Sequence, residues 1–112
     1  MSGKSSRRRG HQFERDVAEW LRSKGVRAHT ARELSGGMQL GSDLITDLPT
    51  TIECKNAAKW DVAGWLRQAR NDAKGDPASL WIKKRGSGDP GASYVVMQAD
   101  DFLALVRPDT EF

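Results

Sequence analysis

The chain has 112 residues, of which 38% are hydrophobic and 29% charged, and its mean hydropathy is −0.64. This length predicts one domain with a single modest core, because two cores would need a longer chain. No apolar run approaches the roughly 18 residues that span a bilayer, and the polar N-terminus has no hydrophobic segment behind it. We therefore expect neither a membrane protein nor a signal peptide.

The cysteine and histidine content narrows the chemistry further. One cysteine excludes an internal disulfide, and one cysteine with two histidines does not supply a usual structural zinc site. Cys54 falls in an apolar alternation and is expected to be a small buried hydrophobic residue. This usage predicts a protein of the reducing cytoplasm.

The net charge of +3 is concentrated at the N-terminus. Residues 1–10 contain no acid and four basic side chains, Lys4, Arg7, Arg8 and Arg9, whereas the remaining 14 basic and 15 acidic residues give −1. Because residues 1–9 lack apolar periodicity, we expect a flexible basic arm in front of a single domain over residues 10–112. The arm is interpreted as a segment that binds nucleic-acid phosphates, with a solubilising tail as the alternative.

Residues 10–24 have the periodicity of a helix. Phe13, Val17 and Leu21 recur at spacings of four, and Gly25 ends the pattern. Glu14 lies at the border of this apolar stripe. It is either an ordinary solvated residue or, if the helix packs across the open end of a later hairpin, an acidic group of a site.

A short strand over residues 26–31 leads into a loop over residues 32–42 that contains three glycines. Glycine lets the backbone approach a partner closely, so we expect a phosphate to bind the loop N–H groups and the Ser35 hydroxyl. His29 lies in the strand, where it either takes part in acid–base or phosphate chemistry or is structural.

Residues 41–55 predict an antiparallel hairpin with a turn over residues 46–50. Side chains alternate along a strand, so Glu53 and Lys55 share a face about 7 Å apart, and the fold-back brings Asp43 level with them. Two carboxylates repel each other unless a cation lies between them, and two carboxylates with open positions suit Mg²⁺. The alternative is a solvated hairpin face with a surface ion pair.

The second half of the chain predicts a helix over residues 60–74, strands over 79–84 and 94–97 joined by a Gly- and Pro-rich tip, and a helix over 100–106. Trp60 and Trp65 are either interface anchors or core residues. Gln68 could lean over the hairpin to hold a water or a phosphate. A second basic element, Lys83, Lys84 and Arg85, either reaches a duplex or is a solvated strand end.

Asp43, followed ten residues later by Glu53-x-Lys55 in an apolar strand, resembles the PD-(D/E)xK nuclease signature, with Ser42 where that family weakly keeps a proline. The order of elements resembles the restriction-endonuclease-like fold, which implies an α/β architecture with a mixed central sheet of about five strands flanked by helices. Residues 7–60 are most similar to the archaeal-type Holliday junction resolvases. That likeness rests on the arginine-rich start, Gly10-x-x-x-Glu14, the loop with Ser35, the Asp43 and Glu53-x-Lys55 core, and Lys59.

The resemblance implies a Mg²⁺-dependent DNA endonuclease, with Mn²⁺ able to substitute, that resolves branched DNA as a homodimer by paired symmetrical nicks. Asp43, Glu53 and the Cys54 carbonyl would hold the metal, Glu14 would be an additional acidic group, and Lys55 would orient or activate the attacking water. Ser35 would touch the scissile phosphate, and Trp60 and Trp65 with their helix would form the dimer interface. The DNA contacts would come from Arg7, Arg8, Arg9, Ser35, Lys59, Lys83, Lys84 and Arg85.

Two departures weaken the choice of substrate: the link from Asp43 to Glu53 is short, and Gln68 is similar to a glutamine in other branches of the superfamily. One alternative is therefore another nuclease of this superfamily, such as a nickase, flap or repair endonuclease acting on double-stranded DNA. The other is a DNA-binding module without catalysis. The small size favours a phage or compact bacterial protein, working in the cytoplasm of a bacterial, archaeal or phage-infected cell.

Overall fold

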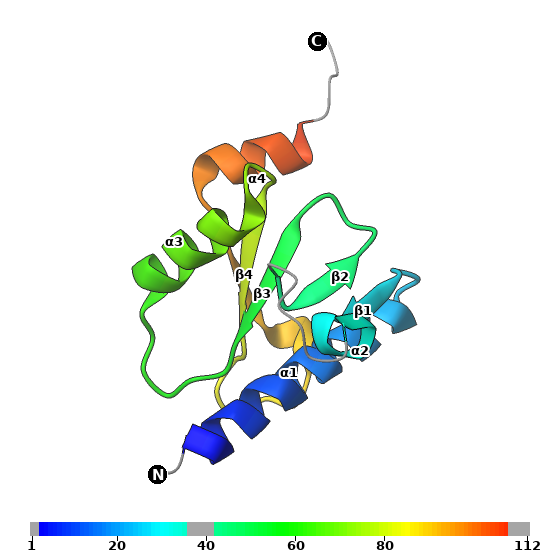
Figure 1. The fold of residues 1–112 in the computed structure, drawn as a ribbon, viewed down its shortest axis with the longest axis vertical. Coiled ribbons are helices and arrows are strands. Elements are labelled where there is room, and N and C mark those ends of the chain that lie inside the picture. The colour runs from blue at the N-terminus through cyan, green and yellow to red at the C-terminus, as the bar shows by residue number, and fades with distance from the viewer. Residues whose placement is uncertain (1–2, 36–41, 108–112) are drawn as a thin grey trace.

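The computed structural model describes residues 3–35 and 42–107, without the side chains of residues 3, 4 and 35. Its elements follow the order α1 (Gly3–Ser23), β1 (Ala28–Thr30), α2 (Ala31–Ser35), β2 (Leu44–Thr46), β3 (Thr51–Lys55), α3 (Val62–Ala73), β4 (Ala78–Ile82), the 3₁₀ turn η1 (Pro90–Ala92), β5 (Tyr94–Val96) and α4 (Ala99–Val106) (Figure 1). The predicted α/β class, with a mixed sheet flanked by helices, is confirmed. Within the described residues no helix is long and apolar enough to cross a membrane.

The five strands lie in sequence order, β1-β2-β3-β4-β5. The β2–β3 hairpin is antiparallel as predicted, whereas β3 and β4 are parallel and are joined by α3 as the crossover helix. β1 pairs antiparallel with β2, and β5 pairs antiparallel with β4. The sheet is therefore mixed, with a parallel pair at its centre.

The two faces of the sheet are covered by different helices. Ile52 and Cys54 of β3 are buried in one core cluster with Phe13, Val17 and Leu21 of α1. The opposite face is covered by α3, whose Ala69 and Ala73 pack on Ala78 of β4. Because side chains alternate along a strand, Glu53 and Lys55 lie on the opposite face, which α3 covers. The prediction that these two side chains share a face is confirmed.

The N-terminal segment differs from the prediction. α1 begins at Gly3, so residues 3–9, expected to lack regular structure, form its first turns, and they extend past the sheet at the lower end of the molecule (Figure 1). Arginine and lysine have good helix propensity, and no proline interrupts the segment, so helix formation continues outward from the packed part of α1. Side chains along the helix also bond one another, as in the hydrogen bond from Gln12 Nε2 to Asp16 Oδ1 at 2.8 Å.

Two loops contain more regular structure than expected. Residue 31, predicted as the end of a strand, and residues 32–35, predicted as loop, form the short helix α2, in which the Glu33 N–H donates to Thr30 Oγ1 at 3.1 Å. The tip after β4, expected to be flexible, contains η1, which is capped by a hydrogen bond from the Gly91 N–H to Asp89 Oδ1 at 2.9 Å. In both places a short side-chain acceptor bonds a nearby main-chain N–H and holds a turn.

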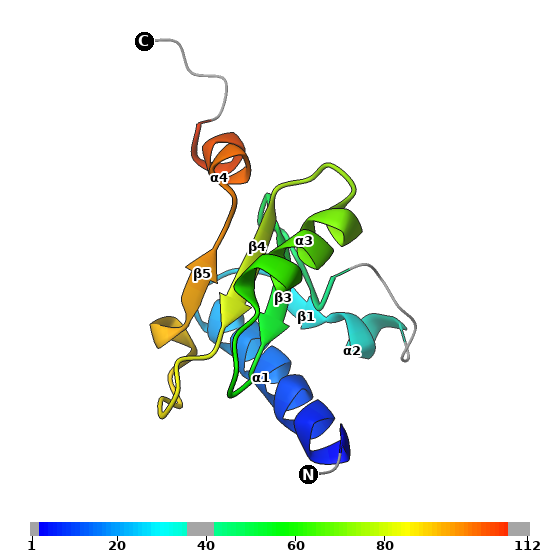
Figure 2. The same ribbon diagram turned by 90° about the vertical axis from the view of Figure 1, so that its left-hand side faces the viewer.

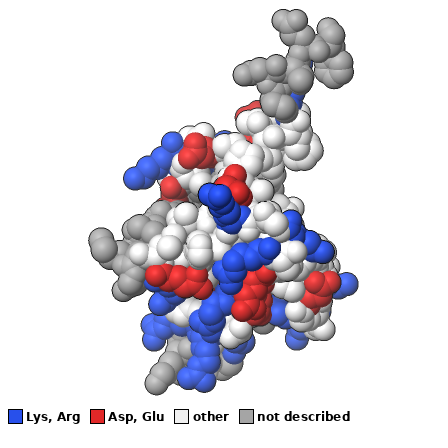
Figure 3. All heavy atoms as spheres, turned by 90° about the vertical axis from the view of Figure 1, so that its right-hand side faces the viewer, with Lys and Arg blue, Asp and Glu red and all other residues white. Residues whose placement is uncertain are grey.

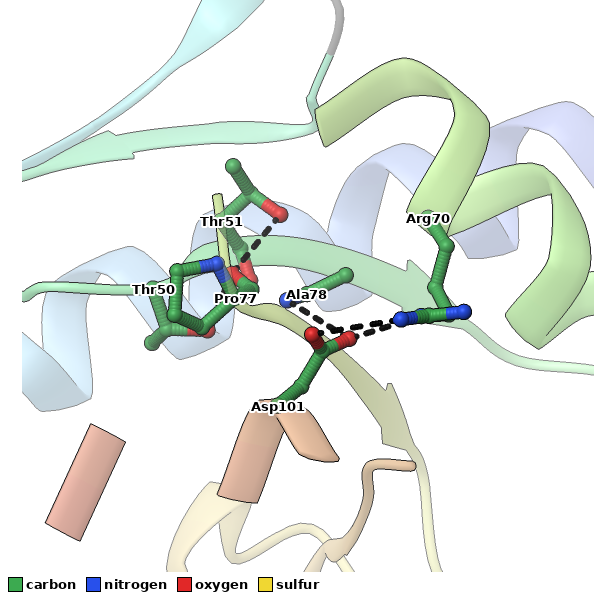
Figure 4. A network of polar contacts seen from close by, with 6 residues as sticks. All are labelled: Thr50, Thr51, Arg70, Pro77, Ala78 and Asp101. Atoms are coloured by element: carbon green, nitrogen blue, oxygen red, sulfur yellow. Dashed lines mark hydrogen bonds and ion pairs between the residues drawn. The ribbon is translucent and has the colours of Figure 1, made fainter. Parts of the chain in front are cut away.

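Helix α4 is attached through a charged residue (Figure 4). Asp101, only 9% exposed, accepts hydrogen bonds from Arg70 Nε of α3 at 2.9 Å and from the Ala78 N–H of β4 at 3.4 Å. Beside it, the Thr50 and Thr51 hydroxyls donate to the Pro77 carbonyl. This network joins α4, α3 and the starts of β3 and β4.

Candidate active site

Asp43 and Glu53 face each other because of the register between β2 and β3. Leu44 pairs with Ile52, so the next antiparallel pair along is Asp43 and Glu53. The Asp43 main chain is fixed on both sides, with its N–H donating to the Ile52 carbonyl at 3.1 Å and its carbonyl accepting from the Ala31 N–H at 2.9 Å. Its carboxylate Oδ2 accepts from the Cys54 N–H at 2.7 Å, and its carboxyl group is hydrogen-bonded to that of Glu53.

Glu14 reaches the same place from α1, on the other face of the sheet. It is 8% exposed and interacts electrostatically with Asp43 and Lys55. Its position one residue after Phe13 places it at the edge of the buried stripe, where the helix passes the end of the hairpin. Asp43 is thus the common neighbour of both glutamates, and three acidic groups gather at one end of the sheet.

All three carboxyl groups hold their protons more tightly than usual. Burial raises the pKa of Glu14 to about 7, with a further contribution from the charge of Asp43. Burial and the Asp43 carboxylate raise the pKa of Glu53 to about 8. Burial also raises the pKa of Asp43, against the stabilising Cys54 N–H and the Glu53 carboxyl. At neutral pH the Asp43 and Glu53 pair therefore shares a proton that a cation could replace.

Lys55 brings the positive charge to this cluster. Its Nζ lies 5.8 Å from the centroid of the Trp65 ring, a cation–π contact between β3 and α3. The ammonium group partly offsets the rise in pKa of both Asp43 and Glu53, so it lies close enough to act on either carboxylate.

An open pocket of about 330 Å³ connects these groups with the basic end of α1. Arg7, His11 and Glu14 line it from α1, Asp43 and Lys55 from the sheet, and Trp65 from α3. Glu53 does not line this pocket, and the charges of Asp43 and of Asp72 on α3 both act on it. Asp43 therefore connects the pocket with the Glu53 carboxyl group.

A second hollow of about 280 Å³ lies directly beside it, and the described residues that line it are all basic or histidine: Arg7, Arg8, His11 and Arg15. Arg32 of α2 also acts on this region, because its charge, after burial, lowers the pKa of His11. Figure 3 shows Lys and Arg side chains gathered over the lower half of the side that carries β1 and α2, with acidic groups among them. A basic surface thus adjoins the acidic cluster.

The donor set fits a magnesium ion. The available groups are carboxylate oxygens and the Cys54 carbonyl, which are hard ligands, and two hydrogen-bonded, half-buried carboxyl groups are an arrangement that a divalent cation relieves. Among the described residues no three His, Cys, Asp or Glu side chains form a metal cage. An incomplete protein shell is expected for Mg²⁺, which keeps several waters and binds through one or two carboxylates.

Residues 5–110 match the model of the family described as phage putative PDDEXK endonuclease. The chain belongs to this family. Its mixed five-stranded sheet flanked by helices is consistent with a restriction-endonuclease-like fold, and membership indicates a nuclease with DNA as its substrate. No curated protein and no solved structure matches the chain significantly.

The structure of this PDDEXK family member brings together Glu14, Asp43, Glu53, the Cys54 backbone and Lys55, as the sequence predicted. Gln68 is exposed on α3 and does not line the pocket; its amide donates at 3.4 Å to Asp72 Oδ2, and the charge of Asp72 acts on Glu53. Ser35 ends α2, but its side chain lies outside the described residues.

The predicted DNA-binding residues lie in different places. Arg7 and Arg8 line the basic hollow, whereas Arg9 turns to Ser6, with 3.4 Å from Nη2 to Oγ. Lys59 is exposed in the loop after β3, and Lys83, Lys84 and Arg85 follow β4. None of these last four lines the pocket.

His29 and the two tryptophans of the second half lie in different surroundings. His29 is exposed, with its Nδ1 3.5 Å from Glu33 Oε2, and it does not line the pocket. Trp65 contacts Lys55, whereas Trp60 is 47% exposed and packs edge-on against Tyr94, with 5.6 Å between ring centroids. The sequence pattern treated the two tryptophans as one pair, but in the structure they contact different residues.

Sequence reasoning missed three residues near the site: His11, Trp65 as a neighbour of Lys55, and Asp72. His11 was detectable, because it lies three residues before Glu14 and shares its face of the helix. The other two depend on how α3 packs over the sheet, and the local pattern contains no signal for that orientation.

Proposed function

We propose that this protein is a Mg²⁺-dependent, structure-selective DNA endonuclease, acting as a Holliday junction resolvase that makes paired symmetrical nicks by phosphodiester hydrolysis. The observation that carries the proposal is the convergence of Asp43, Glu53 and Lys55 beside a basic hollow. Acidic groups alone would repel a DNA backbone, and a basic surface alone would not hydrolyse it. Their adjacency supports a site for metal-assisted phosphodiester cleavage.

Asp43, Glu53 and the Cys54 carbonyl would hold the magnesium ion, with Glu14 as a further acidic group. When bound, the ion would supply an acidified water and neutralise charge that develops on the leaving 3′-oxygen. Lys55, held against Trp65, offsets charge on the attacked phosphate and orients the water. Hydrolysis in this sense leaves a 5′-phosphate on the product.

The basic hollow on α1 would bind phosphates next to the one that is cut. Arg7 lines both the hollow and the pocket, so a strand bound there passes from the basic surface to the acidic cluster. Phosphate contacts position a protein without reading bases, and we therefore expect little sequence specificity. Paired nicks also require two sites related by a two-fold axis, and hence a homodimer.

The test is cleavage of a synthetic four-way junction, a flap and a linear duplex in Mg²⁺, Mn²⁺, Ca²⁺ or EDTA. We expect paired nicks on the junction in Mg²⁺ and Mn²⁺, none in Ca²⁺ or EDTA, and 5′-phosphate ends. Asp43→Asn and Glu53→Gln should abolish nicking, whereas Asp47→Asn, an exposed aspartate of the same hairpin, should not. Retained nicking in Asp43→Asn would remove the catalytic assignment.

Preference among the substrates tests the finer part of the proposal. If the flap and the linear duplex were cut as fast as the junction, another nuclease of this fold would be favoured over a resolvase. Tight binding without cutting in any metal would leave a DNA-binding module.

A further inference from the structure

Helix α4 exposes apolar side chains that the rest of the described chain does not cover. Phe102, Leu103 and Val106 are 50%, 54% and 52% exposed, and Asp101 is the one buried residue in this fully described helix. A helix of eight residues is marginal by itself, and tertiary burial of an apolar face is what normally stabilises it. Here the described attachment is the polar contact of Asp101 beside the half-buried Leu105, and the other large apolar side chains face outward.

The neighbouring edge of the sheet has the same character. β5 is the last strand, and its Tyr94 and Val95 are 46% and 50% exposed. Trp60 extends this surface by packing on Tyr94. Natural edge strands are usually protected by charges, proline or a bulge, and β5, with the sequence Tyr-Val-Val, has neither a charge nor a proline. Figure 2 shows β5 running directly into α4 along one side of the molecule.

We propose that β5 and α4 form the surface on which a second copy of this chain docks, with the two β5 strands paired antiparallel about a two-fold axis. An antiparallel pair of identical strands is self-complementary, so one surface is sufficient to make a closed dimer. Any other occupant would need a matching edge of its own.

The size of the surface suits this occupant. Six large side chains, each about half exposed, present roughly 600 Å² if each contributes about 100 Å² of its area. Tyr94 and Val95 point to opposite faces of the sheet, so this area lies on both sides of the paired edge. A standard interface buries about 800 Å² on each partner. The main chain of the edge strand can supply the remaining buried area, because its outward N–H and C=O groups would pair with those of the partner strand across the axis. The six residues are Trp60, Tyr94, Val95, Phe102, Leu103 and Val106.

This dimer would relate the two acidic clusters in a defined way. β3 is two strands from β5, so the two β3 strands would be separated by five interstrand spacings, about 24 Å across a continuous sheet. The interface is argued from exposed surface and is independent of the reaction, whereas its use in paired nicking rests on the proposed function. It also replaces the α3 surface expected from the sequence, because Trp65 is engaged with Lys55.

The oligomeric state of the full chain tests the inference by sedimentation and light scattering. We expect wild type at about 100 μM to have twice the monomer mass of 12.4 kDa. Val95→Lys and Leu103→Glu should each raise the dissociation constant by about 100-fold or more, because each would bury an unpaired charge. Leu34→Glu, an equal change at a residue of α2 that is 56% exposed, is the matched control and should remain dimeric.

Either of two results would overturn the inference: a monomeric wild type at that concentration, or patch variants that dimerise as tightly as Leu34→Glu. Circular dichroism shows whether each variant folds. Single cysteines at positions 94, 95 and 96 provide a test without added charge, because oxidation should crosslink the position nearest the axis, whereas Glu19→Cys on α1 should not crosslink. Absence of any crosslink in the three edge variants would also refute the pairing.

The two proposals can fail separately. A dimer that cuts no DNA in Mg²⁺ would remove the reaction and leave the interface. A monomer that nicks DNA would remove the interface and leave the reaction.

Discussion

Replacing Glu14 by Gln should stabilise the metal-free protein at alkaline pH while impairing its response to Mg²⁺. The Glu14 side chain is buried against the acidic cluster, and its pKa is raised from 4.5 to about 7, first by burial and then by Asp43. Gln has nearly the same shape and carries no charge at any pH. The substitution therefore isolates the cost of an ionised carboxylate at this place.

The sign follows from proton binding. Between pH 4.5 and about 7 the folded protein holds a proton on Glu14 that the unfolded chain has released, so stability falls as pH rises through this window. The full difference in pKa corresponds to about 3 kcal/mol. Because one side of Glu14 lines an open pocket, solvent screening reduces this, and we expect about 1–2 kcal/mol. For a domain of this size that is roughly 5–10 °C in Tm.

The assay is thermal unfolding in EDTA at pH 5 and pH 8.5. We expect Glu14→Gln to match wild type at pH 5 and to unfold at a higher temperature at pH 8.5, and Mg²⁺ at pH 8.5 should stabilise wild type more than the variant. Glu19→Gln, on the exposed side of the same helix, is the control. A Glu14→Gln difference that is the same at both pH values would refute the reasoning.

Three further changes test other parts of the molecule. Trp65→Leu removes the ring beside the Lys55 ammonium, and we expect kcat for nicking to fall about tenfold with KM little changed, while Trp65→Phe retains most of the rate. Asp101→Ala leaves a guanidinium and a main-chain N–H without their acceptor, and denaturant unfolding should show a loss of about 2 kcal/mol. Arg7→Gln combined with Arg15→Gln should weaken DNA binding equally for all sequences and reduce the slope of log K against log salt by about 2.

Matched controls define what would count against these expectations. Asp100→Ala alters an exposed neighbour of Asp101 and should cost little, so equal losses would contradict the role of the buried carboxylate. Arg67→Gln with Lys74→Gln removes two exposed charges from the α3 region, and an equal fall in salt slope would mean that the basic hollow has no special part. If Trp65→Phe is as slow as Trp65→Leu, the aromatic ring does not position Lys55.

The hairpin could be predicted because its signals are local. A turn sequence fixed the fold-back, and alternation along β3 separated Ile52 and Cys54 from Glu53 and Lys55. With the register set by a short turn, the position of Asp43 opposite Glu53 followed. The position of Glu14 could also be predicted from a local signal. Its place beside the apolar stripe of α1 indicates which edge of the core it borders.

The errors arose where structure depends on packing or helix continuation. Residues 3–9 lack an apolar pattern, which suggested flexibility, but a helix already nucleated by Phe13 and Val17 adds turns at little cost. The rotation of α3 is set by Ala69 and Ala73 packing on the sheet, and the local sequence pattern contains no signal for it. That rotation brings Trp65 to Lys55 and places the Gln68 amide against Asp72.

Because α1 is one unbroken helix, the number of residues between its basic turn and Glu14 determines the direction in which Arg7 points relative to Glu14. One residue inserted between Gly10 and His11 would rotate Arg7 by about 100° around the axis relative to Glu14 and shift it by about 1.5 Å. A bound phosphate would then be directed away from the carboxylates, even though every side chain were still present. A flexible tether would tolerate such an insertion, so chain length in this segment is constrained as strictly as residue identity.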